Sequence, residues 1–310
     1  MGSAAALPHR VGAVLKQSRA PLRTRVAGYV ALTKPRIIEL LLITTVPTMV
    51  VAERGMPSGW LMLNTVIGGT LSAGGANAMN MFIDRDIDRI MQRTKGRPLV
   101  TGVMTPRAAL TFAIGIEAFS FLYLWYWVNL LSAVLALSAC LFYVLVYTLW
   151  LKRRSRQNIV IGGAAGAAPV LIGWAAVTGG LGWAPWILFG VMFLWTPPHF
   201  WALAIKYKDD YASVDVPMLP SVASLRDTAV QIVGYTVAVW ALSIAFWWSA
   251  DLGAVYLVSA VVLGAAFTWL TIVLLRKPTT RNAMKVFTFS ITYVTLLFGA
   301  MALDQLISHG

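Results

Sequence analysis

Charged residues are scarce in this sequence, and acidic residues are fewer than basic ones. Only 12% of the 310 residues are charged, whereas 58% are hydrophobic and the mean hydropathy is +0.72. A soluble domain of this size cannot be so apolar, because its surface would be one continuous hydrophobic patch. The composition therefore excludes a soluble globular protein and predicts a polytopic membrane protein.

Cysteine is almost absent, since Cys140 is the only one in the chain. It lies within an apolar run, where a lone cysteine usually packs as a small hydrophobic side chain. A single thiol excludes an intramolecular disulfide, a cysteine-based metal cluster and a CxxCH attachment to haem. The chemistry of this chain must therefore reside in other residue types.

The N-terminal segment lacks the apolar core that a secretory signal peptide requires. Its first 25 residues contain basic side chains and histidine but no acid. Two interpretations remain: a disordered basic tail on the inner side of a membrane, or the remnant of an organellar transit peptide. The tail, over residues 1–27, is favoured because the segment is short and the membrane domain begins directly after it.

Long apolar runs fill the rest of the chain. A run of ~20 apolar residues is long enough to cross the hydrocarbon core of a bilayer. Nine such runs occur, at residues 28–52, 59–83, 106–127, 129–150, 158–179, 181–205, 226–249, 252–275 and 284–303. We therefore expect an all-α polytopic membrane protein, with nine transmembrane helices bundled around a central cavity in one domain over residues 28–305.

Basic residues are distributed unevenly between the two ends of these runs. Every Lys and Arg except Arg54 lies in the N-terminal tail or near span ends that share one side of the membrane. Because cytoplasmic loops are enriched in Lys and Arg, this asymmetry predicts an inside N-terminus and an outside C-terminus. It also explains most of the net charge of +13, so no nucleic-acid partner is expected.

The second apolar run ends in side chains with the spacing of a ligand set. Asn80, Asp84 and Asp88 are four residues apart, so in a continuous helix they share one face, while Asp86 points away. One amide and two carboxylates suit Mg²⁺ that is also bound by a substrate phosphate. The alternative is a polar helix end whose acids pair with neighbouring arginines. The metal site is favoured because carboxylates facing a membrane interior are costly and usually functional.

Further charged residues lie on the same inner side of the membrane. Lys and Arg neutralise phosphate charge beside a carboxylate-bound Mg²⁺. The candidates are Lys34, Arg93, Lys95, Lys152, Arg153 and Lys206, with Asp209 and Asp210 as further acids. Each basic residue has the alternative role of setting membrane orientation. Lys206, four residues before Asp210, could instead form a simple ion pair.

Several polar residues within the spans are each compatible with more than one role. His199 follows two prolines and lies between Trp195 and Trp201. It fits a haem ligand, a contact to a porphyrin carboxylate or a structural hydrogen-bond donor, and physical grounds alone slightly favour the last. Glu117, in the third run, is a buried structural acid or part of a substrate cavity. Glycines in runs two and five permit either close helix packing or space for a bulky ligand.

Together these motifs resemble the UbiA superfamily of intramembrane prenyltransferases and, within it, the protohaem IX farnesyltransferases. The superfamily resemblance rests on the nine spans, on Asn80-x3-Asp84-x3-Asp88 and on a second acidic patch after span six. The narrower resemblance, over residues 28–303, rests on Leu32-Thr-Lys34-Pro-Arg36, Asp84-Arg-Asp-Ile-Asp88, Arg93-Thr-Lys95, Trp195-Thr-Pro-Pro-His199-Phe-Trp201 and Asp209-Asp-Tyr211. One departure concerns the second Asp-x3-Asp motif of the superfamily, where Lys206 replaces the first Asp and supplies positive charge itself.

The resemblance implies transfer of a farnesyl group from farnesyl diphosphate to a vinyl group of haem B, which gives haem O. The implied Mg²⁺ ligands are Asn80, Asp84, Asp88 and Asp210, with Asp209 beside them. The implied diphosphate contacts are Lys34, Arg93, Lys95, Lys152, Arg153 and Lys206. The implied haem contacts are Trp195, His199 and Trp201.

The resemblance also implies a location and partners. We expect the bacterial cytoplasmic (inner) membrane with the active site facing the cytoplasm, or alternatively the mitochondrial inner membrane. The expected partners are the lipid bilayer and a downstream haem-modifying enzyme. A prenyltransferase for a quinone precursor is the nearest rival function, and the segment from Trp195 to Trp201 distinguishes the two. A secondary transporter is disfavoured, because transporters place ionisable residues near the membrane midplane, whereas the acids here cluster at one face.

Overall fold

The structure is a computed structural model that describes residues 21–309, without the side chains of residues 36–42 and 309. Most of the expected basic tail, residues 1–20, therefore lies outside the described residues. The described part is all-helical and contains no strand, which confirms the prediction of an all-α protein. The α-helices are α1 (Leu22–Thr33), α2 (Arg36–Glu53), α3 (Gly59–Ile83), α4 (Pro106–Trp127), α5 (Leu130–Leu141), α6 (Asn158–Thr178), α7 (Trp183–Lys206), α8 (Lys208–Ala212), α9 (Leu219–Val222), α10 (Leu225–Ser249), α11 (Ala254–Arg276) and α12 (Thr280–His309).

Seven of the described helices are long and apolar enough to cross a membrane, which indicates an integral membrane protein. They are α4, α5 together with the following helix η3 (Phe142–Leu151), α6, α7, α10, α11 and α12. The other two expected spans correspond to α2 and α3. The described apolar part of α2 covers only Ile43–Glu53. Helix α3 has 25 residues, and the asparagines Asn64, Asn77 and Asn80 lower its hydropathy.

The first expected span, residues 28–52, is wrong as one continuous helix. The chain breaks between α1 and α2 at Lys34, which has a left-handed backbone with φ 52°. Pro35 explains the break, because a proline disfavours the helical conformation of the residue before it. The lysine therefore lies at a helix junction, not inside a span.

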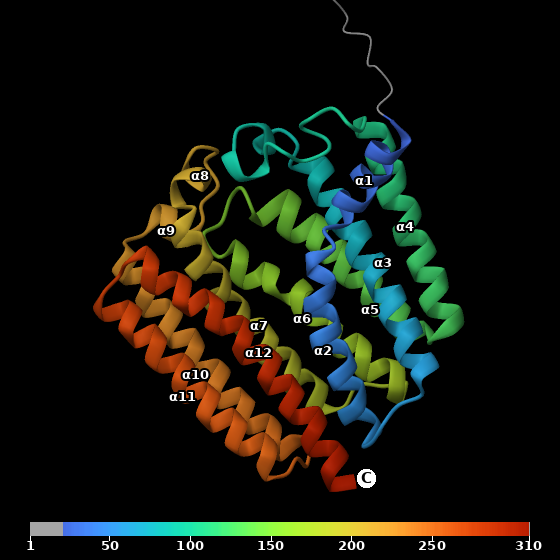
Figure 1. Cartoon of the computed structure of the whole chain (residues 1–310), viewed down its shortest axis with the longest axis vertical. Coiled ribbons are helices and arrows are strands. Elements are labelled where there is room, and N and C mark those ends of the chain that lie inside the picture. The colour runs from blue at the N-terminus through green and yellow to red at the C-terminus, as the bar shows by residue number, and fades with distance from the viewer. Residues whose placement is uncertain (1–20, 310) are drawn as a thin grey trace, which may run out of the picture.

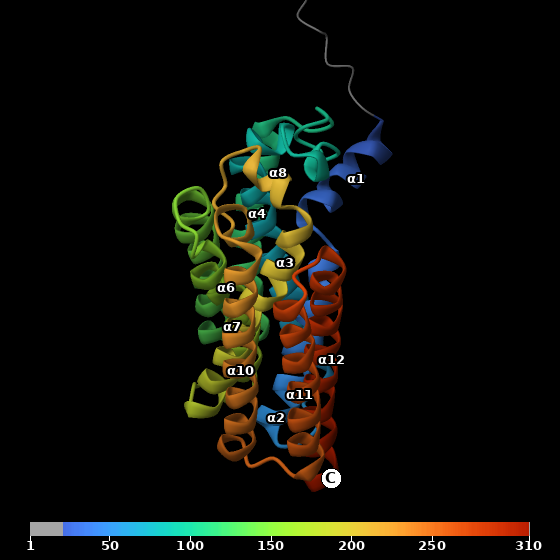
Figure 2. The ribbon, with the colours of Figure 1, turned by 90° about the vertical axis from the view of Figure 1, so that its left-hand side faces the viewer.

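The long helices lie side by side, and the short elements gather at one end of the bundle (Figure 1). This end carries α1, α8, α9 and the 3₁₀ helices η1 (Ile87–Arg89) and η2 (Gln92–Thr94). Turned by 90°, the molecule shows the same separation (Figure 2). Helix α7 packs against α6, α10 and α12, while α3 packs against α4. The described fold thus presents irregular backbone at the end where the sequence concentrates its charge.

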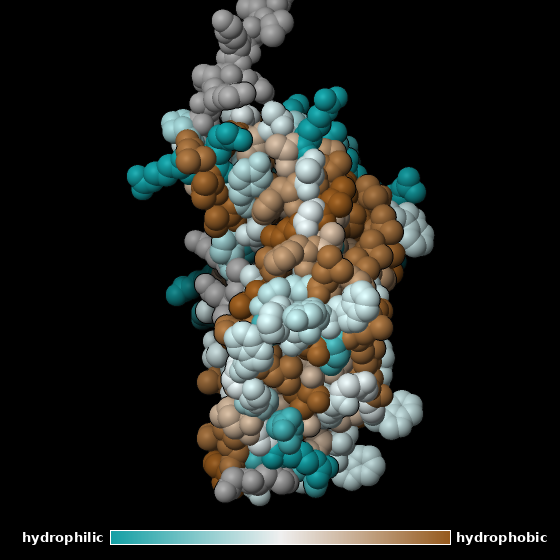
Figure 3. Space-filling model, turned by 90° about the vertical axis from the view of Figure 1, so that its right-hand side faces the viewer, coloured by the Kyte–Doolittle hydropathy of each residue, from teal (hydrophilic) through white to brown (hydrophobic). Residues whose placement is uncertain are grey.

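The outer surface has the distribution of polarity expected in a bilayer. One face is mostly brown or white between teal ends (Figure 3). Large side chains such as Trp125, Trp150 and Trp248 are exposed on the surface of the molecule. Exposed apolar area of this extent requires lipid as its solvent.

Candidate active site at the inner end of α3

The Asn-Asp-Asp motif lies where α3 ends. The helix stops at Ile83, Asp84 is its C-cap residue, and Asp88 lies in the separate 3₁₀ helix η1. The prediction that one continuous helix carries all three residues is therefore wrong. Even so, all three side chains are buried, with exposed fractions of 3% for Asn80, 0% for Asp84 and 3% for Asp88. Two carboxylates buried at a helix end require compensating partners.

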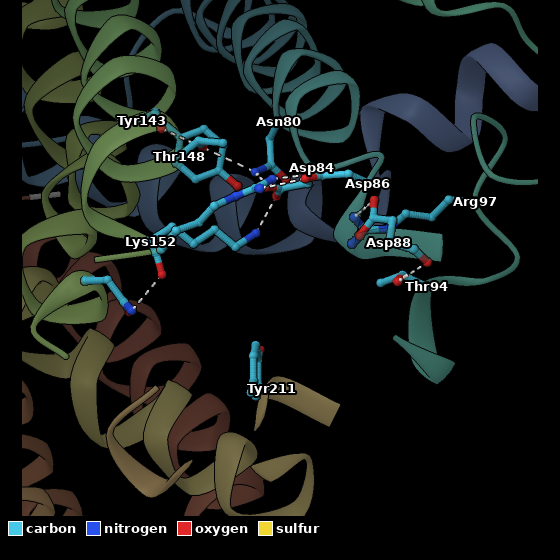
Figure 4. A network of polar contacts seen from close by, with 12 residues as sticks. Asn80, Asp84, Asp86, Asp88, Thr94, Arg97, Tyr143, Thr148, Lys152 and Tyr211 are labelled. Carbon is cyan, nitrogen blue, oxygen red and sulfur yellow. Dashed lines mark hydrogen bonds and ion pairs between the residues drawn. The ribbon is translucent and has the colours of Figure 1, made fainter. Parts of the chain in front are cut away.

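Asn80 forms the centre of a hydrogen-bond network (Figure 4). Its Oδ1 accepts a bond of 3.1 Å from Lys34 Nζ, and its Nδ2 donates to Asp84 Oδ2 at 2.7 Å. The same Nδ2 lies 3.2 Å from Thr148 Oγ1. Three chain segments far apart in sequence thus meet at one amide, which fixes its orientation.

Helix η3 brings the basic partner of Asp84 to this network. It is a π-helix, so it closes i→i+5 hydrogen bonds, and such segments are frequent at functional sites. Lys152 follows its last residue and pairs through Nζ with Asp84 Oδ2. The other oxygen, Asp84 Oδ1, is buried without a hydrogen bond and lies 3.7 Å from an Arg153 nitrogen. The Arg153 guanidinium also donates two hydrogen bonds, of 2.6 and 2.7 Å, to the Asp86 carboxylate.

Asp88 has its own partners in the loop that follows. Arg97 NH1 lies 2.5 Å from Asp88 Oδ2, and Thr94 Oγ1 donates to the Asp88 carbonyl at 2.9 Å. Arg97 thus holds the Asp88 carboxylate in place, while Thr94 stabilises the backbone at η1. The loop therefore holds Asp88 in a set position despite the end of the helix.

Positive charge exceeds negative charge in this buried network. Lys34, Lys152 and Arg97 face the two carboxylates of Asp84 and Asp88. Burial, followed by the charges of Arg97 and Lys152, lowers the pKa of Lys34 to about 7. Burial also lowers the pKa of Lys152, against the opposing effect of Asp84. An incoming polyanion would stabilise the protonated form of both lysines, so the site favours anion binding.

The loop over residues 85–104 contacts α8 at this end of the bundle. Asp210 accepts bonds from the backbone amides of Gln92 at 2.8 Å and Arg93 at 3.3 Å. The Arg93 guanidinium donates to Tyr211 Oη at 3.0 Å and lies 5.0 Å from the centre of its ring. These contacts join the two loops that flank the network.

The remaining predicted residues of this face lie outside the network. Lys95 and Asp209 are exposed, and Lys206 is exposed with its Nζ 5.5 Å from the Tyr207 ring centre. Among the described residues no ion pair joins Lys206 to Asp210. Both carboxylate oxygens of Asp210 bond the η2 backbone. The structure therefore brings together Lys34, Asn80, Asp84, Asp88, Lys152 and Arg153 but not this second group.

An apolar cavity of about 480 Å³ lies next to the network. Its wall includes Asn77, one turn before Asn80, and Tyr147, the residue before Thr148. The rings of Tyr143 and Tyr147 are stacked in this wall, with centres 5.3 Å apart. A volume of this size suits a large apolar ligand, whose polar end would reach the charged network.

Glycines serve both purposes that the sequence left open. A Cβ on Gly163 would lie 2.9 Å from Thr196 Cβ, so this glycine permits close helix packing. A Cβ on Gly166, in the cavity wall, would meet nothing within 4 Å, so that glycine leaves ligand space. Glu117 accepts a bond of 3.0 Å from Ser72, which is part of the cavity wall, but Glu117 itself is not part of that wall.

His199 and Trp195 line the same cavity. Their rings are stacked with centres 4.3 Å apart and an interplanar angle of 20°. His199 Nδ1 lies 2.7 Å from Ser290 Oγ, and Trp195 Nε1 donates to the Ser290 carbonyl at 2.8 Å. Trp201, in contrast, is fully buried, packs edge-on against Tyr235 and is not part of the cavity wall. Helix α7 also runs through both prolines without interruption.

Sequence reasoning missed three residues of the site. Thr148 has no charge and no motif, and only the π-helix explains why it faces Asn80. Arg97 is one of several basic residues in the 85–104 loop, and no spacing in the sequence singles it out as the partner of Asp88. Ser290 lies 91 residues after His199, so only the tertiary fold connects them.

The oxygen donors fit a divalent cation. Among the described residues no three His, Cys, Asp or Glu side chains form a metal cluster by themselves. The amide of Asn80 therefore has to complete the set with Asp84 and Asp88. The orphaned, buried Asp84 Oδ1 is an acceptor without a donor. Hard cations such as Mg²⁺ use one or two carboxylates plus substrate phosphate, so the residues present are sufficient.

Known proteins match most of this chain. The profile of the UbiA prenyltransferase family matches residues 41–296. A protoheme IX farnesyltransferase of Clavibacter sepedonicus is 53% identical over 285 residues, which cover 90% of this chain and 92% of that protein. The profile match includes the cavity wall and every network residue except Lys34, which precedes it.

Solved structures show the same fold. A digeranylgeranylglyceryl phosphate synthase superposes with a TM-score of 0.76 at 18% identity, covering 91% of this chain and 99% of that one. A UbiA homologue from Archaeoglobus fulgidus, bound to DMAPP and Mg²⁺, superposes with a TM-score of 0.62 at 16% identity, covering 89% of this chain and 99% of its own. At such identities the likeness concerns the fold alone.

Proposed function

The chain belongs to the UbiA prenyltransferase family, and we propose that it transfers a farnesyl group from farnesyl diphosphate to a vinyl group of haem B to form haem O. The observation that carries the proposal is the junction of a buried cationic network with an apolar cavity. The network suits a diphosphate, and the cavity suits hydrocarbon and a large aromatic acceptor. The names of the 53%-identical relatives support the haem acceptor.

The diphosphate binds where cations outnumber carboxylates. Lys34, Lys152 and Arg153 stabilise the charge that develops on the leaving group, and fixed charges in a site shielded from water contribute strongly to such catalysis. Arg93, held by Tyr211, covers the site from the loop side. Lys95, in the 85–104 loop, and Lys206, at the end of α7, are exposed and contact the diphosphate as it arrives. Asp209, exposed on α8, assists the Mg²⁺ ligands from the opposite side.

Asn80, Asp84 and Asp88 are the proposed Mg²⁺ ligands, and Asp210 supports them through the η2 loop. Bound Mg²⁺ would neutralise diphosphate charge and so favour ionisation. The structure of a UbiA homologue from Archaeoglobus fulgidus bound to DMAPP and Mg²⁺ supports the use of Mg²⁺. In the absence of substrate, the pairing of Asp84 with Lys152 keeps the buried carboxylate compensated.

The reaction begins when the bond between farnesyl C1 and the diphosphate oxygen breaks. The electron pair leaves with the diphosphate, and an allylic cation remains. The stacked rings of Tyr143 and Tyr147 offer an aromatic surface beside the network, and a cation is attracted to such a face. The terminal vinyl carbon of the acceptor attacks C1 to form the new C–C bond. Water then adds a hydroxyl to the resulting cation and releases one proton to solvent.

Site closure by the two loops protects the cation from premature attack by water. The contacts of Asp210 and Arg93 join the loop over residues 85–104 to α8. Product release then requires these contacts to separate. The proposal therefore gives Asp210 a role in closure as well as in supporting the metal.

We further propose a topology of nine transmembrane helices, in which α2 and α3 add to the seven apolar spans. The N-terminus faces the inside, the C-terminus the outside, and the active site faces the cytoplasm at the bacterial inner membrane. The distribution of Lys and Arg along the sequence, which places all but Arg54 in the N-terminal tail or near span ends on one side, supports this orientation. The product would leave through the membrane towards a downstream haem-modifying enzyme.

The direct test is to incubate the purified protein with haem B, farnesyl diphosphate and Mg²⁺, and to separate the haems chromatographically. We expect a farnesylated haem that requires all three components. A quinone precursor such as 4-hydroxybenzoate serves as the rival acceptor. Prenylation of that compound without farnesylation of haem would assign the chain to the sister activity and refute the proposal.

A further inference from the structure

The hydrogen bonds around His199 assign its tautomer. Ser290 Oγ lies 2.6 Å from the Phe287 carbonyl, to which its hydroxyl donates. A hydroxyl has one hydrogen, so at 2.7 Å from His199 Nδ1 the serine oxygen acts as the acceptor. Nδ1 therefore carries the proton, and in the neutral ring the lone pair lies on Nε2.

The other side of the ring is left for a ligand. Within the described residues no hydrogen bond reaches His199 Nε2. The residue is partly buried and belongs to the wall of the 480 Å³ cavity. The stacked Trp195 ring and the Phe287 ring, 4.7 Å away, hold the imidazole plane in place. An oriented nitrogen lone pair is thus left open in an apolar cavity.

We propose that His199 Nε2 is the axial ligand of the acceptor's haem iron, an inference that rests on the proposed function and adds a geometry to it. Neutral imidazole is a common ligand of haem iron. Histidine ligands usually donate their second N–H to a nearby acceptor, which fixes the tautomer and makes the ligand more basic. The Ser290 hydroxyl oxygen is this acceptor for His199, so Ser290 is a positioning residue.

Iron ligation explains why an apolar cavity has a histidine in its wall that is held in one orientation by Trp195 and Ser290. The iron bond fixes the distance of the porphyrin from α7, and the Trp195 stack restrains rotation of the imidazole. The porphyrin edge then has a constant position relative to the network at Asn80 and Asp84. A vinyl group is thereby presented repeatedly to the same farnesyl carbon.

Three more side chains in the cavity wall are of types that ligate iron in proteins. They are Cys140, Tyr143 and Tyr147. Tyr143 and Tyr147 stack on each other, and Cys140 has no ring, so none of the three combines a stacked partner with a hydrogen-bonded ring nitrogen as His199 does. A thiolate or phenolate ligand gives a spectroscopic signature distinct from that of a histidine, so the test separates these ligands from His199.

The test measures haem B binding without farnesyl diphosphate, so it does not depend on transfer activity. The parent protein carries His9→Ala and His309→Ala, which remove the only other histidines of the chain. Resonance Raman spectra of the ferrous complex should contain an iron–histidine stretching band. His199→Ala should abolish that band and weaken haem binding at least tenfold, and added imidazole should restore a histidine-like spectrum.

Ser290→Ala is the second variant, and it leaves the ligand itself in place. We expect the iron–histidine band to shift to lower frequency, because Nδ1 loses its acceptor and the ligand becomes less basic. An unchanged band in His199→Ala, an unchanged band in Ser290→Ala, or a thiolate or phenolate spectrum in the parent would each overturn the inference. Farnesyl transfer without histidine ligation would refute this inference alone, whereas ligation without transfer would refute only the proposed function.

Discussion

Replacing Asp84 by Asn removes one charge from the centre of the site and preserves the volume of the side chain. Asp84 is fully buried, pairs with Lys152 and lies 3.7 Å from Arg153. At that distance two unit charges interact by ~4 kcal/mol at an effective dielectric constant of ~20. If the carboxylate acts on the bound metal–diphosphate with a similar energy, its loss costs about 10²–10³-fold in kcat, since ~1.4 kcal/mol is a factor of ten.

The matched control is Asp86→Asn, two residues along the chain. Asp86 has an exposed side chain whose partner is Arg153, and an exposed ion pair contributes at most ~1 kcal/mol. We expect kcat within a few-fold of the parent. Turnover is measured as farnesylated haem formed per minute in detergent or nanodiscs.

A folding measurement must accompany this comparison. Asp84→Asn leaves Lys152 as a buried charge without its carboxylate, and breaking a buried pair destabilises proteins by ~3–5 kcal/mol. Thermal unfolding and haem binding therefore serve to select folded protein. Folded Asp84→Asn with nearly normal turnover would refute the reasoning, because it would remove the carboxylate from the metal site.

Four further perturbations test other parts of the site. Tyr147→Leu should lower kcat about tenfold through loss of ~1–2 kcal/mol of cation–π stabilisation, whereas Tyr147→Phe should retain the rate; equal losses in both variants would contradict this role. Gly166→Leu should fill cavity space and raise KM for at least one substrate about tenfold, while Gly115→Leu on the exposed face of α4 should not; unchanged KM would disprove the cavity assignment. Asp210→Ala should raise KM for farnesyl diphosphate by ~10-fold, because two backbone amides of the η2 loop lose an acceptor worth ~1–3 kcal/mol. Faster proteolysis of the 85–104 loop in this variant would show independently that the loop has been released. Removal of Mg²⁺ with EDTA should abolish transfer and its readdition should restore it, and a full rate in EDTA would refute metal dependence.

The sequence predicted the core of the site because burial of acids in an apolar chain is itself informative. Asn80, Asp84 and Asp88 were singled out by spacing and by the cost of carboxylates near a membrane interior. The structure keeps all three buried, yet ends the helix after Ile83. The spacing argument thus singled out three residues that the structure buries, although the continuous helix it assumed ends before Asp88, which contacts to Arg97 and Thr94 hold in place.

Long-range partners could not be predicted from local patterns. Lys34 was recognisable from its position beside Pro35, but its bond to Asn80 joins residues 46 positions apart. Thr148 depends on a π-helix, for which the sequence carries no recognised signal. The same applies to Ser290, whose hydroxyl orients His199 across the interface of α7 and α12.

Some residues of the predicted site shared a motif with the others but not their position. Trp201 lies in the same short string as Trp195 and His199, yet a helix turns by ~100° per residue. Its ring therefore packs into the helical core, where it contacts Tyr235. Residues that are close together in a sequence motif can therefore lie on different faces of the helix, and the motif alone does not show which face each one occupies.

The central claim is tested most directly by mass spectrometry of haem extracted from cells that express this chain. The host should lack its own farnesylating activity and should be compared with the same host expressing Asp84→Asn. The account predicts haem carrying one farnesyl group and one added hydroxyl in the first strain, and only haem B in the second. Haem B alone in both strains, with the folded protein present in the membrane, would contradict the account.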